Sequence, residues 1–194
     1  MARPREFNID HALDQALQVF WSKGYETSSL RDLLGAMGIS RSSFYDTFGS
    51  KHELFLTVID RYNSTVAACG LEAMIHDAPS PKAGIHNLFQ GIIETMVQTG
   101  EKRGCFLNNC AVEVACHDDQ AAGRIAHGIA KAEETFYCAI RRGQKLGEIG
   151  AGKEPRPLAR YLTGMLNGLL VMGKAKPDRR TLQDVVRVAL AALD

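Results

Sequence analysis

The 194-residue sequence has no long apolar run, no C-x-x-C pair and almost no alternation of β-branched residues. Nothing approaches the ~18 apolar residues that cross a bilayer, and the first residues lack the apolar stretch of a signal peptide. We therefore expect a cytoplasmic protein with no membrane partner. The five cysteines are odd in number, which argues against a disulfide framework, and the net charge of +1 does not by itself indicate nucleic-acid binding. These absences leave a globular protein with free thiols, for which we expect no cofactor and no metal.

Apolar residues instead recur at three- and four-residue spacing through most of the chain, which predicts an all-α fold of about nine helices. The helices are expected at residues 9–23, 29–38, 41–47, from 51 onward, 82–99, 105–117, 118–146, 157–173 and 178–193. We divide the chain into an N-terminal unit, residues 1–50, and a larger helical unit, residues 51–194, with the helix from residue 51 as the connector.

The N-terminal unit holds three short helices, and a turn containing Gly38 joins the second to the third. This spacing is typical of a helix-turn-helix motif, in which the second helix of the pair enters the major groove and the flanking chain contacts phosphates. Double-stranded DNA is therefore the expected partner. The alternative is an ordinary helical bundle whose serines only cap helices. Side chains able to donate to bases or phosphates are Thr27, Ser29, Arg41, Ser42, Ser43, Tyr45, Thr47 and Lys51.

Several short runs resemble one known family. The sequence KGYETSSLRD at residues 23–32, GIS at 38–40, FY at 44–45 and SK at 50–51 is similar to the DNA-binding domain of the tetracycline-repressor (TetR) family over about residues 8–60. The resemblance implies a homodimeric transcriptional repressor that binds a palindromic operator through its first three helices, and not an enzyme. It also implies a dimer interface in the last two helices and a ligand pocket in between. Ser42-Ser43 and Asp46-Thr47 depart from the common pattern, so the operator sequence does not transfer.

The helix expected at residues 157–173 supports a homodimer independently of the family. Apolar side chains cover nearly its whole circumference, so more than one neighbour must cover it, and a second copy of the chain is the simplest one. The alternative is a core helix in a monomer. The candidate interface residues on this helix and the last one are Leu162, Leu166, Leu169, Val186 and Leu190.

Cys105 is the candidate regulatory thiol. It follows Lys102 and Arg103 at the expected start of a helix, where unpaired N–H groups and positive charge favour a thiolate. A Gly-Cys pair at this point is also similar to TetR regulators that sense electrophiles or oxidants through a thiol. The alternative function is a helical thiol-dependent enzyme that uses Cys105. A metal site with Cys110 and Cys116 is disfavoured, because one helix cannot bring the three sulfurs together.

An unidentified small-molecule effector is expected to bind between the helices of the larger unit. The candidate walls of this ligand pocket are large apolar side chains, which would serve equally well as plain core residues. They are Phe89, Ile93, Met96, Phe106, Phe136, Tyr137 and Met165.

Overall fold

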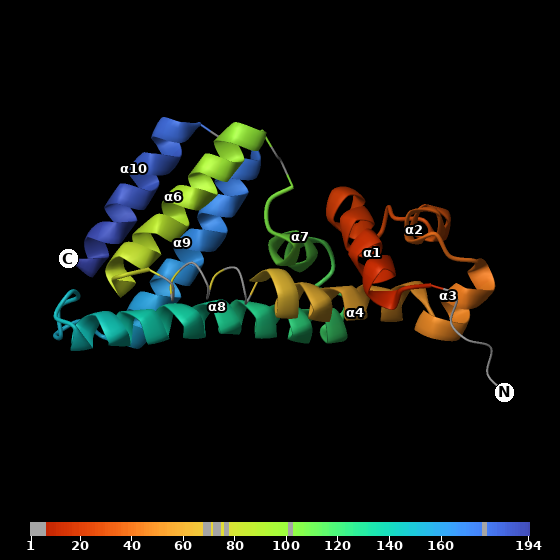
Figure 1. Cartoon of the computed structure of the whole chain (residues 1–194), viewed down its shortest axis with the longest axis horizontal. Coiled ribbons are helices and arrows are strands. Elements are labelled where there is room, and N and C mark those ends of the chain that lie inside the picture. Colours follow the sequence, from red (N-terminus) through yellow and green to blue (C-terminus); the bar gives the residue numbers. More distant parts are fainter. Residues whose placement is uncertain (1–6, 68–70, 72–74, 76–77, 101–102, 176–177) are drawn as a thin grey trace.

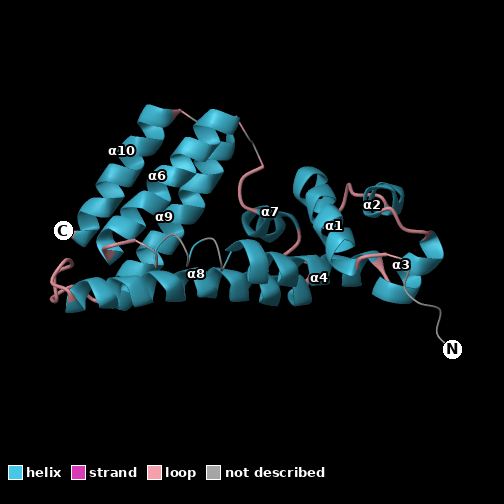
Figure 2. Cartoon of the chain, in the orientation of Figure 1, coloured by secondary structure: helices cyan, strands magenta, loops and turns pink. Residues whose placement is uncertain are grey.

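The computed structural model describes residues 7–67, 71, 75, 78–100, 103–175 and 178–194. Within these ranges the structure has nine α-helices, and the regular elements are all helical, which confirms the all-α class (Figure 2). The α-helices are α1 (Ile9–Lys23), α2 (Leu30–Met37), α3 (Arg41–Phe48), α4 (Lys51–Tyr62), α6 (Pro81–Thr99), α7 (Phe106–Glu113), α8 (Asp119–Lys145), α9 (Pro155–Ala175) and α10 (Arg179–Leu190). A π-helical turn, Asn63–Ala67, follows α4, and a 3-10 turn, Ala191–Leu193, follows α10.

Local capping explains where the first helices begin. Asn8 caps α1, and its side chain accepts a hydrogen bond from the His11 N–H at 3.1 Å. At α2, Ser29 and Asp32 form a reciprocal capping box, and the left-handed Gly38 ends the helix. The side chain of Ser40 caps α3. These short-range interactions set the turn of the helix-turn-helix as the sequence predicts.

Two expected helices end earlier than their patterns indicate. The helix from residue 51 changes at Asn63 into the π-helical turn, where the side chain of Asn63 is buried against α8 and its Nδ2 donates to the Arg124 carbonyl at 2.9 Å. The helix expected to reach His117 ends at Glu113, because the chain turns there and the His117 N–H bonds the Val114 carbonyl instead. Both differences arise where side chains contact distant parts of the chain.

The buried side chains form two hydrophobic cores. The first core joins α1–α4 to α7 and the N-terminal part of α8, and it includes Phe20, Phe44, Phe55 and Phe106. The second core joins α6, α9 and α10 to the C-terminal part of α8. The hydrophobic core of α1–α4 therefore continues into residues 106–125.

The long helix α8 runs along the base of the molecule (Figure 1). Helix α4 lies beside its N-terminal end, α6, α9 and α10 stand on its C-terminal end, and α7 lies between this group and α1. A hydrogen bond and an ion pair join α4 to α8, with 2.8 Å between His52 Nε2 and Asp118 Oδ2 and 3.0 Å between Arg124 Nε and Asp60 Oδ2. Among the described helices, none combines the length and the apolar character that a membrane span requires.

Candidate nucleic-acid interface and neighbouring cavity

Helix α3 has one buried and one exposed face. Phe44 and Phe48 point into the first core, whereas Arg41 and Ser42 are exposed and Tyr45 is 46% exposed. The guanidinium carbon of Arg41 lies 5.9 Å from the centroid of the Tyr45 ring, so the cation and the phenol share one surface. The exposed face carries the donors that major-groove recognition needs.

Three serine hydroxyls meet at the N-terminus of α3. Ser40 Oγ lies 2.9 Å from both Ser42 Oγ and Ser43 Oγ, and it also accepts the Ser43 N–H. Ser43 is half-buried, so Ser42 is the more accessible of the two candidate contacts. Thr47 is half-buried near the other end of α3.

The loop between α1 and α2 and the start of α4 form the flank of this surface. Lys51 Nζ lies 3.4 Å from the Glu26 carbonyl oxygen and 4.5 Å from the centroid of the Tyr25 ring. Thr27 is exposed, and its hydroxyl donates to the Lys23 carbonyl. These contacts place a cation and a hydroxyl beside the N-terminus of α2.

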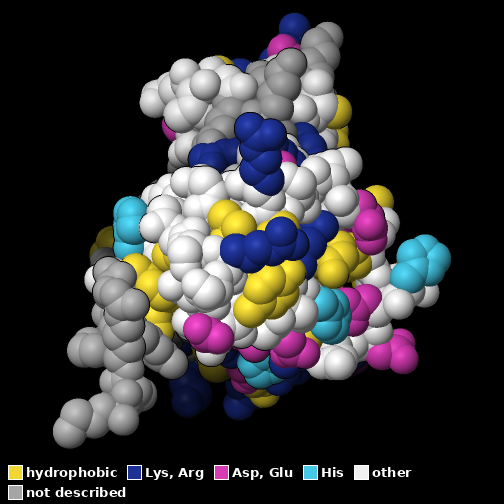
Figure 3. Space-filling model, turned by 90° about the vertical axis from the view of Figure 1, so that its right-hand side faces the viewer, with side chains coloured by type: hydrophobic (Ala, Val, Ile, Leu, Met, Phe, Trp, Pro, Cys, Tyr) yellow, Lys and Arg dark blue, Asp and Glu magenta, His cyan; other side chains and the backbone are white. Residues whose placement is uncertain are grey.

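Ser29 is exposed, but its hydroxyl already donates to Asp32 Oδ2 at 2.7 Å. Hydrogen bonds from Lys23 and Ser29 lower the pKa of the Asp32 carboxyl, which keeps the capping box ionised. Ser29 therefore contributes to this surface chiefly by fixing the N-terminus of α2. Seen from this end, the molecule presents Lys and Arg side chains among hydrophobic ones (Figure 3). A shallow hollow there is lined by Leu30, Arg31, Leu34, Gly35, Ile39 and Arg41.

A cavity of about 350 Å³ lies between α1, α4, α6, α9 and the chain before α7. Trp21 of α1 forms one side, where its Nε1 donates to the Gly104 carbonyl at 3.1 Å and its ring meets Tyr62 edge to face at 5.3 Å. The Arg103 guanidinium lies 4.9 Å from the centroid of the Trp21 ring. The full lining is Trp21, Tyr62, Gly91, Ile92, Thr95, Met96, Thr99, Arg103, Gly104, Cys105 and Leu170.

Cys105 lines this cavity and is the N-cap residue of α7, with no capping hydrogen bond from its side chain. Its sulfur lies 3.8 Å from Tyr62 Oη, and burial next to this thiol raises the pKa of Tyr62. Burial also raises the pKa of Cys110, so that thiol stays protonated. Lys102, cited above as a neighbouring cation, and Cys69 lie outside the described residues. Within the described ranges, no group of three or more His, Cys, Asp or Glu side chains is arranged to hold a metal ion.

The expected pocket residues are spread over several places. Met96 lines the cavity, whereas Ile93, Phe89 and Phe136 lie in the second core, where the two phenylalanine rings stack with centroids 6.0 Å apart. Phe106 lies in the first core. Tyr137 packs under Arg156, whose guanidinium carbon is 3.8 Å from its ring centroid, and Met165 is half-buried against the second core.

The sequence pattern did not indicate Trp21, Tyr62 or Leu170 as cavity walls. The only available signal was that Trp21 falls outside the apolar stripe of its helix.

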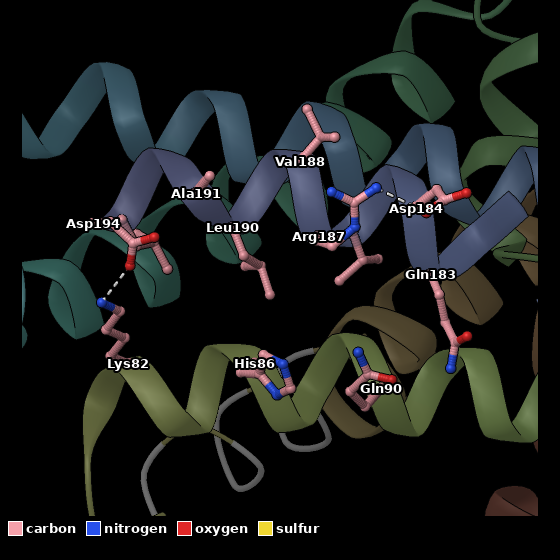
Figure 4. Close-up of a pocket in the computed structure, with 12 residues that line it drawn as sticks. Lys82, His86, Gln90, Gln183, Asp184, Arg187, Val188, Leu190, Ala191 and Asp194 are labelled. Atoms are coloured by element: carbon pink, nitrogen blue, oxygen red, sulfur yellow. Dashed lines mark hydrogen bonds and ion pairs between the residues drawn. The ribbon is translucent and has the colours of Figure 1, made fainter. Parts of the chain in front are cut away.

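The candidate interface residues lie mostly inside one protomer. Leu162, Leu169 and Val186 are fully buried in the second core, and Leu166 is 8% exposed. Leu190 is half-buried on the side of α10 that faces α6 (Figure 4).

A different set of apolar side chains remains exposed on α9 and α10, namely Tyr161, Val171, Met172 and Val188. Gly164 and Gly168 are exposed on α9, and a Cβ at either position would meet nothing within 4 Å. Figure 4 shows Val188 projecting from α10 on the side opposite α6. At one end of the groove between α6 and α10, Lys82 Nζ forms an ion pair with Asp194 at 2.7 Å (Figure 4).

Comparisons with known proteins agree with this geometry. The family model for bacterial regulatory proteins of the tetR family matches residues 12–58, and the model for the tetracyclin repressor-like C-terminal domain matches residues 81–189. The HTH-type transcriptional regulator YezE of Bacillus subtilis (strain 168) is 35% identical over 196 residues, with 100% of each chain covered. The HTH-type transcriptional repressor ComR of Escherichia coli (strain K12) is 27% identical over 97% of this chain and 90% of its own.

A solved structure is similar over the whole chain. A cysteine mutant of the TetR family transcriptional regulator CifR, complexed with 26-base-pair operator DNA, has a TM-score of 0.86 and 30% identity, covering 99% of this chain and 100% of its own. The matches to both parts of the chain indicate the same kind of protein as the exposed α3 and the capped turn before it. The chain belongs to the tetracycline-repressor (TetR) family of bacterial regulatory proteins, and it is a DNA-binding transcriptional regulator, not an enzyme.

Proposed function

We propose that this regulator is a homodimeric repressor that binds a near-palindromic operator and is released when a small molecule enters the Cys105 cavity or when the Cys105 thiol is modified. The observation that carries the proposal is that one cavity is lined by both Cys105 and Trp21. Because Trp21 belongs to α1, an occupant of the cavity contacts the DNA-binding helices directly. The relative CifR is described in complex with operator DNA, and ComR is described as a repressor.

For DNA recognition, we assign Arg41 to a base edge and Ser42 and Ser43 to the adjoining base edges or backbone. An arginine that pairs with a guanine in a bidentate manner contributes about 1–3 kcal/mol of discrimination. The remaining candidates, Thr27, Tyr45, Thr47 and Lys51, are assigned to phosphates, because hydroxyls and ammonium groups bind phosphate oxygens without reading sequence, and Ser29 supports them by fixing the N-terminus of α2.

For dimerisation, we assign the exposed face of α9 and α10, with Val171, Met172 and Val188 at its centre and the two exposed glycines allowing close helix approach. Leu166 lies at its border and Leu190 faces α6 instead, while Leu162, Leu169 and Val186 support the face from inside the protomer. A two-fold dimer presents two recognition helices to successive major grooves about 34–36 Å apart. Any change in their separation therefore weakens one half-site.

For release, modification of Cys105 places a new group in the cavity, against walls whose side chains already contact one another. The thiolate attacks the carbon of an electrophile and forms an S–C bond. With iodoacetamide, iodide leaves and the thiol proton passes to solvent. The added group occupies the space next to Tyr62 and Trp21, and displacing Trp21 breaks its hydrogen bond to Gly104. A coupling of about 1–3 kcal/mol is typical of such switches.

The test uses fluorescence anisotropy with a labelled duplex from the DNA that flanks the regulator's own gene. The dimer should bind it with an affinity that falls steeply as salt rises. Iodoacetamide should weaken this binding and change the emission of Trp21, the only tryptophan in the chain. Cys105→Ser should abolish both responses. Cys116→Ser, which removes an exposed thiol elsewhere, should keep them.

Either of two results would count against the proposal. If the folded dimer does not bind this duplex at low salt, the operator assignment fails. If the Cys105→Ser protein is still released by iodoacetamide, the thiol role fails.

A further inference from the structure

The last residue of α7 contacts the DNA-binding unit through its side chain. Both carboxylate oxygens of Glu113 accept backbone hydrogen bonds from the loop between α1 and α2. Oε2 accepts the Tyr25 N–H at 3.0 Å, and Oε1 accepts the Glu26 N–H at 2.9 Å. Hydrogen bonds to an ionised acceptor are about twice as strong as neutral ones. This carboxylate therefore fixes two successive peptide groups of the loop.

Gly24 makes this contact possible. Its φ of +85° lies in the region that side chains rarely adopt, and a Cβ there would sit 2.8 Å from both carboxylate oxygens of Glu113. The backbone at the end of α1 is thus shaped to receive the carboxylate. A residue with a side chain at this position would both strain the turn and displace Glu113.

The two residues whose N–H groups Glu113 binds, Tyr25 and Glu26, also contact Lys51. Lys51 Nζ lies 3.4 Å from the Glu26 carbonyl and 4.5 Å from the centroid of the Tyr25 ring. The exposed Thr27 follows directly in the chain. A cation and a hydroxyl that face the DNA side of the molecule are therefore positioned by one carboxylate from the larger unit.

Helix α7 also touches the cavity at its opposite end. Cys105 is its N-cap residue, and Asn109 in the same helix accepts a hydrogen bond from Lys174 Nζ of α9 at 2.8 Å. The helix spans Phe106–Glu113, so a displacement at its start moves Glu113 with it. The eight-residue helix thus joins the cavity to the loop that carries the phosphate contacts.

We infer that Glu113 is a positioning residue for operator binding: it fixes the loop between α1 and α2 so that Lys51 and Thr27 meet the phosphate backbone, and it transmits displacements of α7 to that loop. The positioning part depends only on DNA binding by the family fold. The transmission part rests on the proposed function of the Cys105 cavity.

The first measurement compares Glu113→Ala with Asp119→Asn in the full-length protein. Asp119 is exposed and lines the same surface hollow as Glu113, and its substitution removes the same charge, so Asp119→Asn is a matched control. Glu113→Ala should weaken binding to the duplex from the regulator's own flanking DNA about tenfold. It should also reduce the slope of log affinity against log salt by about one for each protomer, because the Lys51 phosphate contact is lost. Glu113→Gln, which retains one acceptor oxygen, should be intermediate.

The salt slope separates positioning from a loss of folded protein. A smaller folded fraction multiplies every measured affinity by one factor and leaves the slope unchanged. If Glu113→Ala binds with the affinity and slope of Asp119→Asn, the positioning inference is refuted, as it is if the affinity falls with an unchanged slope.

The second measurement repeats the titrations after iodoacetamide treatment, with modification of Cys105 checked by mass spectrometry. The wild type and Asp119→Asn should lose affinity on modification, whereas Glu113→Ala should lose less than about threefold. An equal loss in Glu113→Ala refutes transmission through this residue. No loss in the modified wild type refutes the proposed thiol switch and the transmission with it, while the salt slope still decides the positioning part.

Discussion

The crossing of α4 and α8 provides a sharp test of the packing, through the substitution Gly128→Ala. A Cβ at residue 128 would lie 2.1 Å from Asn63 Oδ1 and 2.6 Å from Leu107 Cδ1, so neighbouring atoms must move. Asn63 is 2% exposed, and its Nδ2 donates to the Arg124 carbonyl at 2.9 Å. Moving it breaks a buried hydrogen bond, which costs about 1–3 kcal/mol, and overpacking adds a similar amount.

The gain in helix propensity from replacing a glycine by alanine offsets about 1 kcal/mol of this loss. We therefore expect Gly128→Ala to lower the free energy of unfolding by about 1–5 kcal/mol. Gly123→Ala is the matched control in the same helix, because Gly123 is exposed and a Cβ there meets nothing within 4 Å. It should raise stability by about 0.5–1 kcal/mol.

Urea denaturation followed by far-UV circular dichroism measures both variants. The protomer concentration is held constant, because dimerisation makes the apparent stability depend on it. Replacing Asn63 by Ala in the Gly128→Ala protein should recover part of the loss, since the nearest clashing atom is then absent. A Gly128→Ala protein as stable as Gly123→Ala would refute the close packing of α4 on α8.

Three further predictions follow from the surface and the caps. Arg41→Ala should weaken operator binding by about 1–3 kcal/mol and relax specificity at one position per half-site, while binding to unrelated DNA, measured by anisotropy, changes little. Val188→Glu should dissociate the dimer in analytical ultracentrifugation, and Val112→Glu, at an even more exposed site on α7, should not; two dimeric variants would exclude the α9–α10 face. Hydrogen bonding from the Ala121 N–H lowers the pKa of the Asp118 carboxyl in the folded protein. The ionised carboxylate therefore stabilises the fold at pH values above its unfolded pKa of about 3.9. This stabilisation is lost as the pH falls through the lower folded pKa. Asp118→Asn should therefore flatten the fall of unfolding free energy below about pH 5, and an unchanged pH profile would contradict the assignment.

The helix-turn-helix could be predicted from the sequence because its determinants lie close together in the chain. Ser29 and Asp32 are three residues apart at the start of α2, and Gly38 and Ser40 are two residues apart in the loop between α2 and α3. Each helix boundary therefore depends on local hydrogen bonds. The exposed positions on α3 follow from the same spacing, since Phe44 and Phe48 determine which face is buried.

Features that depend on distant contacts could not be predicted. The capture of the Tyr25 N–H by Glu113 joins residues 88 positions apart, and the contact of Trp21 with Gly104 joins residues 83 apart. Helical periodicity shows which apolar side chains share one face of a helix, but not which neighbouring element covers that face. For this reason Leu162 was expected at a dimer interface although it lies inside the protomer, and Phe136 was expected in a ligand pocket although it stacks in the core.

The continuation of the first core into α7 and α8 constrains any attempt to graft this DNA-binding unit onto another regulator. Trp21 packs against Phe106 with ring centroids 6.2 Å apart. A chimaera joined at residue 50 would keep Trp21 but replace Phe106 with a foreign side chain. A transplant that retains operator specificity must therefore carry residues 106–125 of this chain, or redesign their counterparts in the recipient, along with the recognition helix.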